Sequence, residues 1–176
     1  SWCWEKFLPW FANHGYASYA LNFRGHAGSD GRSRLRWHSA ASGYVADLEQ
    51  AISSLDRPPV LIGHSMGGYV VQKFLENASV PAAVLMASIP LNGLRGAARR
   101  MFLKHPVRFL KYLLFLDSWQ FVATPELARE LCFSPDFSGP DVDRYLGLLQ
   151  KDSFVATIDM MTRLPRPELV RTPMLI

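Results

Sequence analysis

The sequence predicts an α/β protein in which a mainly parallel sheet is flanked by helices and interrupted by a helical cap insertion. Helical and β-type patterns alternate through residues 1–89. A G-x-S-x-G turn at 63–67 joins a short apolar run to a helical pattern. Residues 94–162 contain helical patterns without a convincing strand. Such alternation favours parallel strands, because each parallel pair needs a crossover connection that a helix can supply.

The first elements are a helix and a strand. Phe7 and Phe11 share one helical face and Gly15 is a stop signal, so we expect a helix over 4–13. Residues 16–23 are β-rich and mostly apolar, which predicts a buried parallel strand.

The next elements lead into and out of the serine turn. A Gly-, Ser- and Arg-rich loop covers 24–42, and helical spacing of apolar residues predicts an amphipathic helix over 43–55. The apolar run 59–62 predicts the strand before the turn, and 69–76 reads as the helix after it. Residues 82–87 predict the following buried strand.

The second half of the chain predicts a cap. Pro106 interrupts one helical segment, Thr124 precedes a proline as an N-cap, and another helix should begin near Pro140. Thr172–Ile176 looks like the start of a strand. We therefore assign 1–89 and 164–176 to an incomplete core, and 90–163 to a helical cap over the strand ends.

The turn itself carries the chemistry. A strand, a tight turn with serine at its tip and a helix are the context of a nucleophile elbow, so Ser65 is the predicted nucleophile. The turn strains the serine backbone and needs small residues beside it, which we expect to be Gly63 and Gly67. The Met66 N–H is placed to hold a developing oxyanion at the helix N-terminus. The side chain of His64 is expected to point away from the site.

Composition excludes several other classes of protein. No His or Cys pair has metal-ligand spacing, so neither a metal nor a cofactor is expected. The longest apolar run, 82–87, is too short to span a bilayer. Nothing indicates nucleic-acid binding. No leader pattern is visible, and Cys3 and Cys132 are expected to be thiols, which favours the cytoplasm.

The net charge of +4 is concentrated in one segment, 95–111, which holds six basic residues and no acid. Two interpretations are open. The basic and apolar residues can form a weak contact with anionic lipid or an acidic partner, without stable membrane insertion. Alternatively, they form a solvated helix face whose aliphatic stems cover apolar surface.

These motifs resemble the α/β-hydrolase superfamily, in its capped esterase/lysophospholipase-like branch. The resemblance covers essentially the whole chain and is carried by Gly63–Gly68, the run Pro59–Ile62 and the loop Leu21–Asp30. In the family that loop commonly reads D-x-R-G-x-G-x-S. Arg24, Gly25 and Ser29 match this pattern, whereas Asn22 and Ala27 depart from it.

The resemblance implies acyl transfer on Ser65, usually hydrolysis of small-molecule esters, with a histidine as base and an acid that orients it. Chain order in this fold is serine, acid, histidine, which places both partners beyond Ile176 and the second oxyanion donor before Ser1. We therefore expect the chain to be truncated at both ends and close to inactive alone. Phe102 and Phe109 are candidates for an acyl-chain pocket, and core packing is the alternative explanation.

Other assignments stay open at this point. His26 and His38 lie in the loop at the strand ends, where a structural role competes with that of general base. C–C bond or thioester hydrolysis and peroxidation are sibling chemistries on the same elbow. A ligand-binding homologue that keeps the serine without catalysis is the alternative from a different class.

Overall fold

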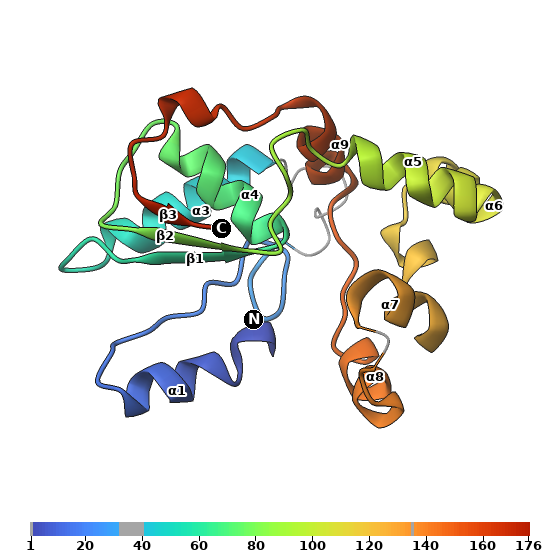
Figure 1. Ribbon diagram of the computed structural model, residues 1–176, viewed down its shortest axis with the longest axis horizontal. Coiled ribbons are helices and arrows are strands. Elements are labelled where there is room, and N and C mark those ends of the chain that lie inside the picture. The colour runs from blue at the N-terminus through green and yellow to red at the C-terminus, as the bar shows by residue number, and fades with distance from the viewer. Residues whose placement is uncertain (1, 32–40, 135) are drawn as a thin grey trace.

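The computed structural model describes residues 2–31, 41–134 and 136–176, and a three-stranded parallel sheet forms the middle of one of its two lobes (Figure 1). The strands β1 (Leu61–His64), β2 (Ala83–Met86) and β3 (Met174–Leu175) lie in that order. Leu61 pairs with Ala83 and Ala83 with Met174 in parallel register. The expected α/β class and parallel sheet are confirmed, although the elbow strand begins two residues later than its apolar run.

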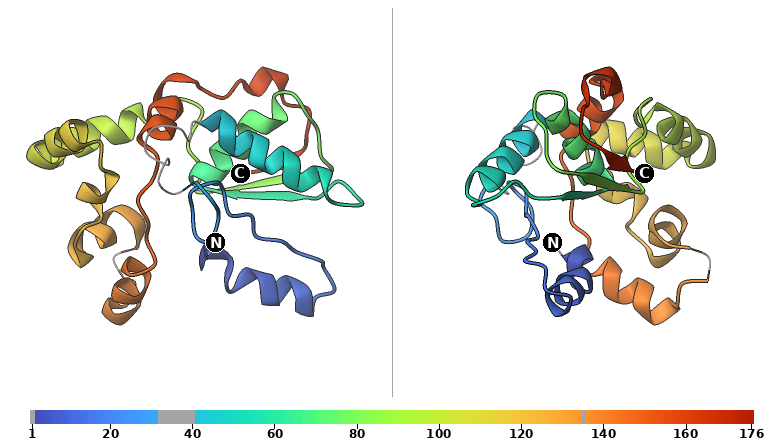
Figure 2. Two further views of the ribbon diagram at one scale, coloured as in Figure 1. Left: turned by 180° about the vertical axis from the view of Figure 1, so that it is seen from behind. Right: turned by 60° about the vertical axis from the view of Figure 1, so that its left-hand side comes forward.

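Two helices cover one side of the sheet. α4 (Met66–Leu75) contacts β1 and β2, and α3 (Ala41–Ser53) packs on α4. α1 (Phe7–Asn13) lies on the opposite side of the strands and has no buried residue (Figures 1 and 2). The short 3-10 helix η1 (Trp2–Trp4) precedes α1. All three α-helices were expected from the sequence.

Two apolar clusters hold these layers together. Leu75 and Leu85 belong to the cluster between α4 and the sheet. Tyr44, Tyr69 and Met160 belong to a second cluster, which joins α3, α4 and α9 (Phe154–Thr162). Both tyrosines are fully buried, so the elbow helix is enclosed along most of its length.

The prediction of a strand over 16–23 is wrong. This segment is extended but irregular, and Tyr16 and Tyr19 are 64% and 76% exposed. A strand exists only through hydrogen bonds to a neighbour, and no described residue supplies one here. The apolar, β-rich composition reflects a local preference for extended backbone, and it does not indicate whether a partner strand is present.

The second half of the described chain is helical, as expected. α5 (Arg95–Lys104) and α6 (Pro106–Phe115) meet at the predicted break, and the 3-10 helix η3 (Ser118–Phe121) follows. Then come α7 (Pro125–Cys132) and α8 (Gly139–Leu146), whose N-caps Thr124 and Ser138 accept hydrogen bonds from Leu127 N and Asp141 N. None of the helices within 2–31, 41–134 and 136–176 has the length and apolar character needed to cross a bilayer.

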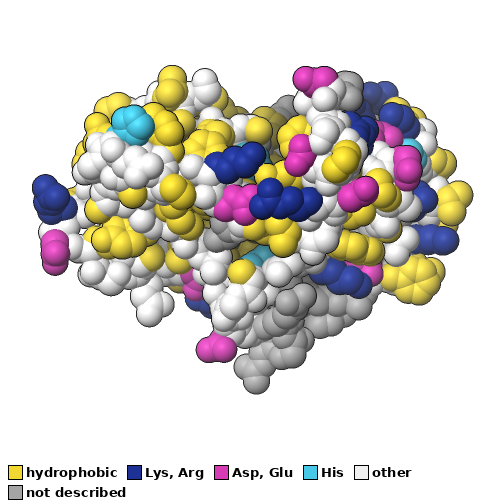
Figure 3. Space-filling model, turned by 90° about the horizontal axis from the view of Figure 1, so that it is seen from below, with side chains coloured by type: hydrophobic (Ala, Val, Ile, Leu, Met, Phe, Trp, Pro, Cys, Tyr) yellow, Lys and Arg dark blue, Asp and Glu magenta, His cyan; other side chains and the backbone are white. Residues whose placement is uncertain are grey.

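These helices form a lobe beside the sheet lobe (Figures 1 and 3), and the two meet where Arg144 Nη2 on α8 donates to Glu5 Oε1 at 2.8 Å. α9 returns from this lobe and packs on α3 in the core cluster. The 3-10 helix η4 (Pro167–Leu169) then leads to β3. The domain limits 1–89, 90–163 and 164–176 stay a prediction, and α9 lies at the junction of the two parts.

A buried carboxylate ties the end of the elbow helix to the segment before β3. The Glu76 side chain is 2% exposed and accepts bonds from Lys73 Nζ at 2.6 Å and Arg166 Nη2 at 2.9 Å. The backbone N–H of Arg166 donates to the same carboxylate at 3.1 Å. Burial raises the pKa of Glu76, but the bonds from Lys73 and Arg166 outweigh it, so the net pKa lies below its ordinary value.

We expect Glu76→Gln to lower the free energy of unfolding at pH 7 by about 1–2 kcal/mol, because a charge-assisted network is lost. The folded-state pKa lies below the unfolded value near 4.5, so this stabilisation is present above that pH and is lost as the pH falls. Urea unfolding at pH 7 and pH 4 measures it. Glu49→Gln, at an exposed helix position, is the matched control. Equal losses in both variants at pH 7 would contradict the role of Glu76.

Candidate active site

Ser65 stands at the tip of the turn between β1 and α4. Its backbone has φ 53° and ψ −119°, a region that residues with a Cβ rarely adopt. Ser65 is half-buried. It occupies the N-cap position of α4, but its side chain makes no capping hydrogen bond to the helix. The hydroxyl is therefore not used to cap the helix, as a serine at this position ordinarily would be.

The strained backbone is held by hydrogen bonds to both flanking elements. Ser65 N donates to Met86 O at 3.1 Å, which joins the turn to the end of β2. The Ser65 carbonyl accepts from Gly68 N at 3.0 Å and from Ile89 N at 3.3 Å. Strain persists only where surrounding contacts over-determine it, and these bonds meet that condition.

The glycines around Ser65 have different roles from those expected. A Cβ on Gly63 would lie 2.7 Å from Gly68 Cα, so Gly63 is required as predicted. A Cβ on Gly67 would meet no heavy atom of the described residues within 4 Å, so their packing gives no steric reason for glycine there. Gly68 is the second constrained position, because its Cβ would overlap Ser88 on the loop after β2. Gly68 thus approaches the loop that follows β2, and sequence spacing does not reveal this neighbour.

Gln72 is a positioning residue that the sequence did not single out. It lies on α4 and is 5% exposed, and its Nε2 donates to Ser88 Oγ at 2.9 Å and to Ile89 O at 3.0 Å. These bonds fix the loop in which Ser88 lies against Gly68 and the Ile89 N–H donates to the Ser65 carbonyl. A glutamine on the inward face of an otherwise apolar helix was the available signal, since buried polar groups need partners.

The N-terminus of α4 faces the same turn. Met66 is its first residue, so the Met66 N–H has no acceptor within the helix, whereas the Gly68 and Tyr69 N–H groups donate to Ser65 O. An unpaired N–H and the positive end of the helix dipole can stabilise an anion beside Ser65. The oxyanion role of Met66 stays a prediction.

No histidine or carboxylate among the described residues hydrogen-bonds the Ser65 hydroxyl. His64 is exposed. His14 Nδ1 lies 2.7 Å from Trp10 O, and His105 Nε2 lies 3.1 Å from Glu130 in the cap. His38 lies outside the described residues. The expected acid and base beyond Ile176 stay a prediction.

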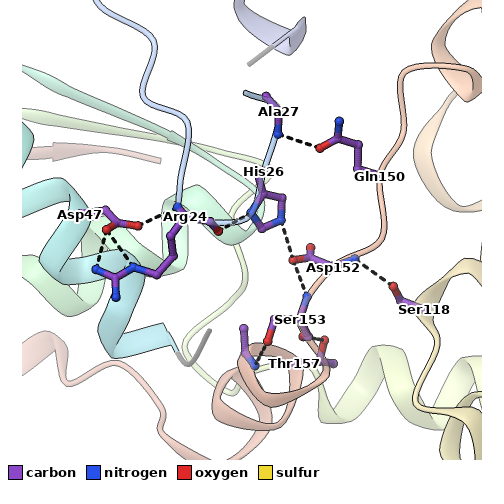
Figure 4. A network of polar contacts seen from close by, with 10 residues as sticks. Arg24, His26, Ala27, Asp47, Ser118, Gln150, Asp152, Ser153 and Thr157 are labelled. Carbon is purple, nitrogen blue, oxygen red and sulfur yellow. Dashed lines mark hydrogen bonds and ion pairs between the residues drawn. The ribbon is translucent and has the colours of Figure 1, made fainter. Parts of the chain in front are cut away.

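The loop after residue 23 is braced by Arg24, one of the positions that match the family pattern. Arg24 Nη2 donates to Asp47 Oδ1 on α3 at 2.6 Å, and Arg24 N donates to Asp47 Oδ2 at 2.9 Å (Figure 4). Gly25 N donates to Asp30 O at 2.7 Å and closes the loop. Charge-assisted pairs of this kind fix orientation as well as position.

His26 belongs to a contact between this loop and the α8–α9 connection. Its Nε2 lies 3.2 Å from Asp152 Oδ1, and Ala27 N donates to Gln150 Oε1 at 2.9 Å (Figure 4). The Nδ1 of the same ring lies 3.2 Å from Arg24 O. Both ring nitrogens thus face protein acceptors, which supports the structural alternative for His26.

The two aromatic pocket candidates lie on α5 and α6. Phe109 is half-buried, with ring centroids 5.7 Å from Phe102 and 6.3 Å from Phe121. Phe102 is exposed at the edge of this cluster. Packing therefore accounts for Phe109, and contact of either ring with substrate stays a prediction.

Comparison with known proteins identifies the family. A family model described as the alpha/beta hydrolase family matches residues 1–176, and the chain therefore belongs to this family. A non-heme chloroperoxidase from Streptomyces lividans is 36% identical over 91 residues, which are 49% of this chain and 32% of that protein. The chain thus spans about a third of the chloroperoxidase.

A solved structure has the same fold. The monoacylglycerol lipase of Paleococcus ferrophilus matches with a TM-score of 0.64 over 99% of this chain and 66% of that chain. Sequence identity in this match is 20%, so it bears on the fold alone. The expected α/β-hydrolase fold is confirmed.

We expect Gly63→Ala and Gly68→Ala to destabilise the protein by about 1–3 kcal/mol, because each added methyl meets packed atoms. Gly67→Ala should change stability by less than about 1 kcal/mol, because its Cβ enters open space. Chemical denaturation of the three variants measures the contrast. A Gly67→Ala loss as large as that of Gly63→Ala would contradict this packing.

Ala27 occupies a left-handed position with φ 50°, where the family pattern has glycine. We expect Ala27→Gly to stabilise the protein by about 0.5 kcal/mol, because relief of backbone strain exceeds the added unfolded-state entropy. Gly28→Ala is the matched change at the next position, which does not have a positive φ and where an added Cβ would meet no described atom within 4 Å. It should raise the free energy of unfolding by up to about 1 kcal/mol. Thermal unfolding measures both, and a destabilised Ala27→Gly variant would contradict the strain.

Proposed function

We propose that the protein is a serine hydrolase that cleaves carboxylic esters through an acyl-enzyme on Ser65. The observation that carries the proposal is the Ser65 backbone at φ 53° and ψ −119°, between a parallel strand and a helix N-terminus. That conformation is strained, and strain is concentrated at functional sites. Membership of the alpha/beta hydrolase family supports the same class of activity.

The proposed reaction has two acyl-transfer steps. Ser65 Oγ attacks the ester carbonyl while its proton passes to a histidine base, and the Met66 N–H stabilises the oxyanion. Collapse expels the alcohol, which takes the proton from the imidazolium. Water then attacks the acyl-enzyme by the same route and releases the carboxylic acid. The base, its acid partner and the second oxyanion donor are proposed to lie beyond residues 1–176.

The substrate class is a lipid-like or small acyl ester. The elbow lies at the carboxyl end of β1, where ligands of parallel sheets bind, and the cap lobe follows the carboxyl end of β2 (Figure 1). Phe102 and Phe109 are proposed to contact the acyl group. The monoacylglycerol lipase with the same fold is named for such an ester.

Peroxidase chemistry on the same elbow is the second candidate, and the similarity to a non-heme chloroperoxidase favours it. Hydrogen peroxide would replace water in the second step, so that the acyl-enzyme yields a peroxy acid and free Ser65. C–C or thioester hydrolysis and ligand binding without catalysis have no observation of their own in their favour.

We expect Ser65→Ala to abolish labelling by a fluorophosphonate and to lower kcat/KM on p-nitrophenyl esters by about 10⁴-fold or more, because the nucleophile is lost. The protein as its gene encodes it is the material to use. Ser54→Ala, at an exposed serine after α3, is the matched control and should retain both signals. Ester turnover that survives in Ser65→Ala would contradict the proposal.

Two further outcomes separate the alternatives. A wild-type protein that is folded but not labelled would indicate a ligand-binding homologue. A protein that is labelled at Ser65, turns over no ester with water and forms peroxy acid with hydrogen peroxide would indicate the second candidate.

A further inference from the structure

The outer face of α6 is apolar. Val107, Leu110 and Leu114 recur at i, i+3 and i+7 and are 66%, 66% and 72% exposed. This spacing places them in one stripe along the helix. A helix on a protein surface ordinarily presents polar residues outward, so the stripe calls for an explanation.

Packing of the cap does not explain this stripe. The opposite face of α6 carries Phe109 and Tyr112, whose rings pack on Phe121, with centroids 6.3 Å and 5.3 Å away. Tyr112 also lies 5.6 Å from Phe154 on α9. α6 therefore has a satisfied inner apolar face and a second apolar face that no described residue covers.

α5, which contacts α6, carries a further exposed leucine and exposed cations. Leu103 is 63% exposed, and Arg99 and Arg100 stand one helical turn before it. Lys111 lies among the exposed leucines of α6. Seen from below, hydrophobic and Lys/Arg side chains alternate at the end of the molecule that α5 and α6 form (Figure 3).

Three of the six basic residues in 95–111 have partners within the protein. Arg95 Nε donates to Met161 O, Lys104 pairs with Glu130, and Arg108 donates to Gln120 O. Arg99, Arg100 and Lys111 form no hydrogen bond or ion pair among the described residues, and all three are exposed. Three positive charges without a partner among the described residues thus lie on the two helices that carry the exposed leucines.

We propose that this α5–α6 face, defined by Leu103, Val107, Leu110, Leu114 and the three cations, docks on the surface of an anionic lipid bilayer. The apolar side chains would enter the headgroup–acyl boundary, and the cations would pair with lipid phosphates. Charge selects this occupant over a second copy of the chain, because two such faces would bring like charges together. An uncharged apolar partner would leave the cations desolvated without counter-charges.

The position of the face fits a peripheral mode of contact. α5 and α6 form the end of the cap lobe that lies farthest from the sheet, so a bilayer can approach them without meeting the sheet lobe (Figures 1 and 2). If the proposed function holds, a lipid-like ester would be drawn from the same bilayer. Docking itself does not depend on Ser65.

Co-sedimentation with vesicles tests the proposal, with the protein as its gene encodes it. We expect binding to vesicles of phosphatidylcholine with about 30% phosphatidylglycerol, and at least about tenfold weaker binding to vesicles of phosphatidylcholine alone. Binding should weaken as salt rises from about 0.1 M to 1 M, because screening shortens the range of the attraction. Ser65→Ala should bind like the wild type, which separates failure of docking from failure of the proposed function.

Two pairs of variants test the face itself. Arg99→Ala with Arg100→Ala, and separately Leu110→Asn with Leu114→Asn, should each weaken binding to anionic vesicles by about tenfold or more. Arg57→Ala with Arg171→Ala removes the same charge elsewhere on the exposed surface, and Leu131→Asn with Leu169→Asn removes exposed leucines elsewhere. Both control pairs should bind within about twofold of wild type. Circular dichroism establishes that each variant is folded.

The proposal is overturned by any of three results. The wild type does not bind anionic vesicles, or the control pairs lose as much binding as the test pairs. Alternatively, sedimentation equilibrium shows a dimer that Leu110→Asn with Leu114→Asn dissociates, which would make this face an interface between copies of the chain.

Discussion

The turn at Ser65 is the constraint on which the rest of the structure depends. A residue with a side chain is held at positive φ there because its carbonyl and N–H are bonded to α4, to the end of β2 and to the loop beyond it. Those bonds need the backbones to approach closely, which only Gly63 and Gly68 permit. The two strands, the elbow helix and the loop after β2 are therefore one unit, and the serine side chain makes no capping bond to the helix that it precedes.

Polar contacts between distant segments connect this unit to the cap lobe. The loop that carries Arg24 and His26 is fixed to α3 through Asp47 and to the α8–α9 connection through Asp152. The residues joined by the second contact are 126 positions apart in the chain. Side-chain contacts, rather than sheet pairing, therefore hold this loop against the α8–α9 connection.

The helical lobe has two apolar surfaces with different neighbours. The aromatic cluster around Phe109 and Tyr112 joins α6 to η3 and α9, so it sets how the cap helices pack. The outward stripe on α5 and α6 contributes nothing to that packing. Packing within the protein explains the apolar residues of the inner surface alone, and the proposed contact with lipid concerns only the outer surface.

Much of the site and fold could be predicted from local signals in the sequence. The elbow strand and helix, the break at Pro106 and the N-cap at Thr124 depend on residues within one turn of each other, and the structure has each of them. The strand expected over 16–23 failed because a strand also needs a neighbour, which composition does not supply. The contacts of Gln72, Asp47 and Asp152 could not be predicted because their partners lie on other elements.

By itself, the sequence determined the class of fold and the residue at the tip of the turn, because steric and hydrogen-bonding preferences act over a few residues. Only the tertiary structure decided that Gly68 rather than Gly67 is sterically required, that His26 braces a loop, and that α6 has an apolar face turned outward. Each of these depends on which segments are neighbours in space, and that is fixed by packing of the whole chain.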